Sequence, residues 1–168
     1  MNDNMTPRVG VVMGSQSDWA TMQHANMTLD KLGIENEARV ISAHRTPDLL
    51  EEWVGSARER GIQVIIAGAG MAAHLAGVTA AKTSLPVLAV PLGGGALDGV
   101  DALYAMVQMP KGIPVGTFAI GKSGAINAAL FAASMLALSN EDIAESYENF
   151  RRDQTAQGVA NSVPETVA

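Results

Sequence analysis

The 168-residue chain has no cysteine, few aromatic residues and little charge. The absence of cysteine excludes disulfide bonds, thiolate metal ligands and thiol nucleophiles. Charged residues make up 17% of the chain and hydrophobic residues 48%. That composition is apolar for a small domain with its whole surface in water. We therefore expect part of the surface to be buried between subunits.

Basic residues are too few and too scattered for a nucleic-acid interface. The formal net charge is −6, and the aromatic residues are two Trp, two Tyr and three Phe. A nucleic-acid partner would need a basic patch and, for single strands, rings on which bases stack. We expect no nucleic-acid partner. A small anion remains compatible, because a helix N-terminus and one arginine can hold a phosphate in an acidic protein.

No segment has the pattern of a membrane span or a secretion signal. The longest apolar stretch, residues 125–138, is interrupted by Asn127 and Ser134 and is too short to cross a bilayer. The first four residues, Met-Asn-Asp-Asn, lack the basic and apolar regions of a signal peptide. We expect a cytoplasmic protein without a membrane partner.

Strand-like and helix-like patterns alternate along the chain. Short apolar runs predict strands at residues 8–13, 38–41, 62–67, 86–90 and 115–120. Apolar residues at three- and four-residue spacing predict helices at residues 19–32 and 47–60. Further helices are predicted at residues 71–82, 100–107 and 127–138, and a polar helix at residues 140–154. The helix at 127–138 has apolar residues on nearly every side, so we expect it to be buried all round.

This alternation predicts an α/β fold, a three-layer α/β/α sandwich around a doubly wound parallel five-stranded sheet of flavodoxin- or Rossmann-like type. Residues 1–156 form a single α/β catalytic domain in this interpretation, and residues 157–168 form a C-terminal tail. Ligands of such sheets bind beyond the C-terminal ends of the strands. That rule selects four loops, at residues 14–18, 42–46, 68–74 and 91–97.

The first of these loops leads into a helix N-terminus. Ser15 and Ser17 add hydroxyl donors to the free backbone N–H groups there, which favours a phosphate. Asp18 would repel a phosphate and is better suited to accept hydrogen bonds from ribose hydroxyls. Ser15 and Asp18 also fit the Ser-x-x-Asp capping pattern. Capping alone or binding alone would produce this sequence.

The second loop carries the string Ser-Ala-His-Arg-Thr-Pro. Thr46 is a natural N-cap and Pro47 a natural first helical residue, so Ser42, His44 and Arg45 stand at another helix N-terminus. An arginine there can bind a phosphate through two parallel hydrogen bonds. A histidine can take up and return a proton near neutral pH. At the end of a strand, we interpret the pair as functional rather than as solvated surface side chains.

The third and fourth loops are rich in glycine. The third resembles G-x-G-x-x-G loosely, but the last glycine is not at the required place, so we predict no dinucleotide site. His74 in this loop either lines the pocket or holds the loop through a hydrogen bond. The fourth loop has three adjacent glycines, residues 93–95, which we interpret as a flexible wall or lid. No metal-ligand spacing is present, and we expect no metal.

Together these strings resemble the PurE family. They are Gly-Ser-Gln-Ser-Asp at 14–18, Ser-Ala-His-Arg-Thr-Pro at 42–47, Gly-Ala-Gly with Ala-Ala-His-Leu at 68–75, and Val-Gln-Met-Pro at 107–110. The resemblance implies conversion of N5-carboxyaminoimidazole ribonucleotide to 4-carboxy-5-aminoimidazole ribonucleotide in de novo purine biosynthesis. It implies no metal or organic cofactor, a ribonucleotide substrate, CO2 as an enclosed intermediate and a homo-octamer.

The resemblance also implies roles for individual residues. His44 would be the general acid/base, which protonates the departing carbamate nitrogen and later removes the surplus ring proton. Arg45 would hold the phosphate or adjoining oxygens together with Ser15 and Ser42, and Asp18 would bind the ribose hydroxyls. The remaining substrate-binding residues would be Ser17, Gly70, Ala72, His74 and Leu75.

Two alternatives stay open. One is direct carboxylation of aminoimidazole ribonucleotide by CO2, and the other is a non-catalytic nucleotide-binding regulator. A related animal-type branch carboxylates directly and tends to have Lys in place of Arg45 and no Pro47, so this chain resembles the mutase side. Met71 and Ala76 stand where many members have Gly and Pro.

Overall fold

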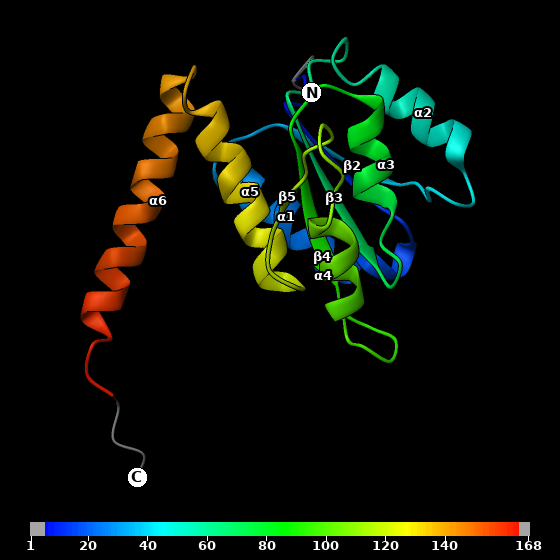
Figure 1. Ribbon diagram of the computed structural model, residues 1–168. Helices are drawn as coiled ribbons and strands as arrows, with labels where there is room; N and C mark the ends of the chain where they lie inside the picture. The colour runs from blue at the N-terminus through cyan, green and yellow to red at the C-terminus, as the bar shows by residue number, and fades with distance from the viewer. Residues whose placement is uncertain (1–5, 165–168) are drawn as a thin grey trace.

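The five strands form one parallel sheet in the computed structural model, which describes residues 6–164 (Figure 1). They are β1 (Val9–Met13), β2 (Asn36–Val40), β3 (Val64–Gly70), β4 (Val87–Leu92) and β5 (Gly116–Thr117). All neighbours pair in parallel, in the order β2-β1-β3-β4-β5. This is the doubly wound, flavodoxin-like order, with its switch point between β1 and β3. The predicted fold class is confirmed.

Helices cover both faces of this sheet. They are α1 (Trp19–Lys31), α2 (Pro47–Gly55), α3 (Leu75–Lys82), α4 (Val100–Val107), α5 (Lys122–Leu136) and α6 (Glu141–Ala160), with a short 3-10 turn, η1 (Gln16–Asp18). Helices α1 and α5 pack on one face, while α2, α3 and α4 pack on the other (Figure 1). Among the residues from 6 to 164, no helix is long and apolar enough to cross a membrane.

The central strands are buried on both faces, which explains their unbroken apolar runs. Every residue of β1 is buried. Val11 packs in the core that faces α1 and α5, and its neighbour Val12 packs in the core that faces α2 and α3. In β3, Ile66 likewise packs in the core that faces α1 and α5, and Ile65 packs in the core that faces α2 and α3. Strand alternation therefore supplies both hydrophobic layers from the same short segments.

The boundaries of α2 and α3, the helices beside the second and third loops, differ from the sequence prediction. Helix α2 ends at Gly55 rather than near residue 60. Ser56 donates its hydroxyl to the carbonyl of Glu52 at 2.9 Å, and Arg60 donates to the carbonyl of Trp53 at 2.9 Å, so side chains satisfy the helix end early. Helix α3 begins at Leu75 rather than residue 71, because β3 continues to Gly70 and a turn follows.

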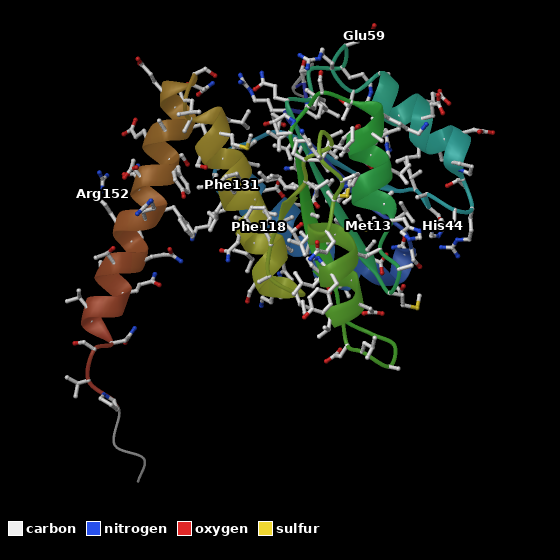
Figure 2. All side chains as sticks on the ribbon, in the orientation of Figure 1. Met13, His44, Glu59, Phe118, Phe131 and Arg152 are labelled. Atoms are coloured by element: carbon white, nitrogen blue, oxygen red, sulfur yellow. The ribbon has the colours of Figure 1, made fainter. Side chains whose placement is uncertain are left out.

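The prediction that the helix near residues 127–138 is buried all round is wrong for the single chain. Its buried face consists of Gly124 and Leu136 with alanines between them, which pack against the sheet and α1. Phe131 on the other face is 50% exposed and contacts Phe118, with ring centroids 5.5 Å apart (Figure 2). Small residues allow the close approach on one side, and a large apolar residue stays in solvent on the other.

Helix α6 leads away from the body of the fold (Figure 1). Asn140 caps its N-terminus by accepting a hydrogen bond from the backbone N–H of Ile143 at 3.0 Å. Ile143 is buried, and Tyr147 and Phe150 are partly buried against the hydrophobic core on the α1 and α5 face of the sheet. All residues from 151 to 160 are exposed. The helix continues to Ala160 and thus includes the first residues of the segment expected to be a tail.

Candidate active site

A pocket of about 490 Å³ lies at the C-terminal end of the sheet, around the switch point between β1 and β3. All four loops selected from the sequence line it. In Figure 2, His44 lies on the same side of the molecule as Met13, the last residue of β1. A larger hollow, about 830 Å³, lies at the opposite end of β4. Its lining is mostly apolar, and its one charged side chain, Lys82, already pairs with Glu51 at 2.7 Å.

The first loop forms the predicted capping box. The backbone N–H of Ser15 donates to Oδ2 of Asp18 at 2.9 Å. The Ser15 hydroxyl oxygen accepts from the Ser17 backbone at 3.4 Å and from the Ser17 hydroxyl at 3.0 Å. These bonds hold two hydroxyls and one carboxylate together at the rim of the pocket.

Burial raises the pKa of Asp18 above its usual value. Backbone hydrogen bonds from Ser15 and Gly14 and the positive charge of Arg45 act in the opposite direction, in that order of size. The carboxylate is therefore partly desolvated but well supplied with donors. Such a group is set to accept further hydrogen bonds from a ligand.

The second loop is tied to the first by its arginine. Nη2 of Arg45 donates to the carbonyl of Gly14 at 2.9 Å. The backbone N–H of Arg45 donates to the hydroxyl of Ser42 at 3.2 Å, and the backbone N–H of Ser42 donates to the hydroxyl of Thr46 at 3.0 Å. Thr46 occupies the N-cap position before Pro47, as predicted, but its side chain bonds Ser42 instead of capping the helix.

The third loop brings a second histidine to the first one. Nε2 of His44 lies 2.8 Å from Nδ1 of His74, and the two rings meet edge to face at 85°. A tight turn directs His74 into the pocket: Met71 and Ala73 have φ of 54° and 44°. The backbone N–H of Ala73 donates to the carbonyl of Gly70 at 3.1 Å. Of the two predicted roles, His74 does line the pocket, and its ring bonds His44 rather than its own loop.

The fourth loop forms a neutral wall. Gly94 and Gly95 have φ of 121° and 70°, values that favour glycine. The backbone N–H of Gly94 donates to the carboxylate of Asp98 at 3.3 Å. A side chain added at Gly95 would lie 3.6 Å from Cγ of Met71, so the third and fourth loops meet at the mouth of the pocket.

The structure gathers most of the predicted site residues in this one pocket. They are Ser15, Ser17, Asp18, Ser42, His44, Arg45, Gly70, His74 and Leu75. Ala72 is exposed and does not line it, because the turn directs the neighbouring Ala73 inward. The remaining lining residues were selected from the sequence only as members of these loops, and they are Gly14, Ala43, Ala69, Met71, Ala73 and residues 93–95. Among residues 6–164, no three His, Asp or Glu side chains gather in a way that could hold a metal ion.

Known proteins resemble this chain over nearly its whole length. A family model described as AIR carboxylase matches residues 8–157. The N5-carboxyaminoimidazole ribonucleotide mutase of Vibrio cholerae is 56% identical over 156 residues, covering 93% of this chain and 97% of that protein. The protein of the same name from Bacillus subtilis is 55% identical over 163 residues, covering 97% and 100%.

Solved structures agree with these sequence matches. A crystal structure of PurE from Treponema denticola superposes with a TM-score of 0.84 at 26% identity, covering 92% of this chain and 96% of that one. The family model and the two relatives each span more than two thirds of the chain. The chain belongs to the AIR carboxylase family.

Proposed function

We propose that this protein is an isomerase of de novo purine biosynthesis that converts N5-carboxyaminoimidazole ribonucleotide to 4-carboxy-5-aminoimidazole ribonucleotide. Relatives more than 50% identical over nearly the full chain are named as this mutase. The observation that carries the proposal is the convergence of His44, Arg45 and Asp18 on one pocket, from two loops that are far apart in sequence.

The polar groups of the pocket suit a nucleoside monophosphate. Arg45 and the hydroxyls of Ser15, Ser17 and Ser42 provide donors for the phosphate, beside the positive ends of the helices that follow both loops. Asp18 provides the acceptor for the ribose hydroxyls. The small residues of the third loop, including Gly70, leave room for the flat imidazole ring against the backbone.

His44 carries the chemistry in this proposal. It gives a proton to the carbamate nitrogen, the bond from that nitrogen to the carboxyl carbon breaks, and CO2 is released into the pocket. The nucleophilic ring carbon forms a bond to CO2, and His44 takes the proton displaced from that carbon, which restores its starting state. Each step uses only the substrate's electron pairs and one proton. Retaining CO2 requires closure, for which the neutral third and fourth loops are placed at the mouth.

The competing function is direct carboxylation of aminoimidazole ribonucleotide, which the description of the matching family names. A substrate-choice assay separates the two. The purified protein is given either N5-carboxyaminoimidazole ribonucleotide or aminoimidazole ribonucleotide with bicarbonate. Efficient use of the second mixture alone would overturn the mutase assignment, and binding without turnover of either would indicate a regulator.

We also propose that the protein assembles as a homo-octamer in the cytoplasm. The octameric number comes from the resemblance to the PurE family. Its support on the surface is an apolar stripe on α4, formed by Val100, Tyr104 and Val107, and the exposed Phe131 of α5. The cytoplasm follows from the proposed substrate, whose phosphate opposes passage through a bilayer. Size-exclusion chromatography with light scattering tests the assembly, and a stable monomer would contradict it.

A further inference from the structure

The two histidines of the pocket form a direct nitrogen-to-nitrogen hydrogen bond. Nε2 of His44 and Nδ1 of His74 are 2.8 Å apart, within the range of a good hydrogen bond. One nitrogen must donate and the other accept, so a single proton lies between the rings. The two residues come from different loops, so their contact links the proposed acid/base to the loop that walls the pocket.

This bond determines where the protons of His44 lie. In a neutral imidazole only one ring nitrogen carries a proton. If Nε2 of His44 donates to His74, then Nδ1 of His44 has a free lone pair and is the base. When His44 takes up a second proton, both of its nitrogens become donors, and Nδ1 of His74 has to be the acceptor. The bond persists in both states only if His74 is the Nε2-protonated tautomer.

We propose that His74 is a positioning residue, which orients the His44 imidazole by accepting a hydrogen bond from its Nε2–H group. Proton transfer to and from the substrate then runs through Nδ1 of His44. The inference rests on the proposed function, in which His44 is the acid/base. Beyond that function, Nδ1 of His44 is the reacting atom, and His74 is the residue that fixes the tautomer of His44.

A neutral orienting residue suits this pocket better than a carboxylate would. In hydrolases with a catalytic triad, an aspartate holds the histidine in its tautomer. Here the proposed substrate carries a phosphate and a carbamate, which a second carboxylate would repel. Among the residues that line the pocket, Asp18 and Arg45 carry charge, and Arg45 is tied to the first loop. An imidazole can accept the hydrogen bond from Nε2 of His44 without adding negative charge.

The backbone holds His74 firmly enough for this role. It precedes the first residue of α3, and its carbonyl accepts from Val78 at 2.9 Å. The preceding Ala73 is buried, with 4% of its surface exposed, and its N–H is bonded to Gly70. The ring is thus carried on an anchored turn, while its polar atom faces His44.

Two variants of His74 and one control variant test the proposal. His74→Leu removes the polar atom, whereas His74→Asn places an amide oxygen close to the position of Nδ1. We expect kcat to fall about tenfold in His74→Leu, near the upper effect of one lost hydrogen bond, with KM changed less than about twofold. His74→Asn should recover most of kcat. His24→Leu, on α1 outside the pocket, is the matched control and should leave both values unchanged.

A spectroscopic measurement makes the outcome independent of turnover. The chain has three histidines, so 15N-labelled imidazoles give three sets of signals, and the variants assign them. We expect one tautomer of His44, protonated at Nε2, in the wild type and in His74→Asn. In His74→Leu we expect a mixture of the two neutral tautomers of His44.

The outcomes are distinguishable. An unchanged His44 tautomer in His74→Leu would overturn the inference, and so would a higher KM with unchanged kcat, which would make His74 a substrate-binding residue only. A wild-type protein that turns over neither substrate would overturn the proposed function instead, while the imidazole spectra would still report on the pair.

Discussion

Replacing Arg45 tests how the pocket holds an anion. One guanidinium nitrogen of Arg45 already bonds the carbonyl of Gly14 at 2.9 Å, which leaves the other N–H groups for the phosphate. A charge-assisted hydrogen bond contributes about 1.5 to 3 kcal/mol, and 1.4 kcal/mol corresponds to a factor of ten. Arg45→Lys keeps the charge but loses the planar fork, so we expect KM to rise about tenfold. Arg45→Met loses the charge and the hydrogen-bond donors together, and we expect KM to rise about a hundredfold.

The assay is steady-state kinetics with N5-carboxyaminoimidazole ribonucleotide, together with thermal unfolding. We expect kcat to change little, because Arg45 binds the phosphate equally in the ground state and the transition state. Arg58→Lys is the control, since Arg58 is exposed outside the pocket and bonds the hydroxyl of Ser84 at 3.1 Å. An unchanged KM in Arg45→Met, with the fold intact, would refute the assignment of the phosphate to this end of the pocket.

Two further changes test the electrostatics and the packing. Burial raises the pKa of Asp18, so the ionised carboxylate is disfavoured in the folded state. The contribution of Asp18 to the free energy of unfolding should therefore fall as pH rises above 3.8, the ordinary value for this side chain. Urea unfolding measures the free energy of unfolding at each pH. Relative to the wild type, Asp18→Asn should gain stability as pH rises through this range, and the same pH dependence in both proteins would contradict the account. Gly124→Ala should destabilise the protein by about 3 kcal/mol or more, because its new Cβ would lie 1.7 Å from the carbonyl oxygen of Ala119. Gly158→Ala, in open space on α6, should raise the melting temperature slightly, and an equal loss in both variants would count against the packing of α5.

Sequence patterns predicted the sheet and the site well where the signal is local. Continuous apolar runs identified β1 and β3, because both faces of these strands are buried. The polar loops at the ends of β1 and β2 could be assigned to one pocket because parallel strands present their C-terminal ends at a common edge. The residues that approach one another across that edge, Arg45 and Gly14, are 31 positions apart, and no periodicity indicates such a bond.

The errors have physical causes that no local pattern carries. Met71 and Ala73 adopt positive φ although neither is glycine, so the helix predicted from residue 71 begins only at Leu75. The same turn removes Ala72 from the pocket lining. The pairing of His44 with His74 depends on how two loops meet in space. Hydropathy alone also did not separate the exposed Phe131 from the buried alanines of α5.

A crystal structure of the protein with 4-carboxy-5-aminoimidazole ribonucleotide would test the central claim most directly. We expect the phosphate to lie within hydrogen-bond distance of Arg45 and the Ser15 or Ser42 hydroxyl, the ribose hydroxyls to lie at Asp18, and the carboxylated ring carbon to lie beside the His44 imidazole. A phosphate bound elsewhere, or a ring held many ångströms from His44, would contradict the account.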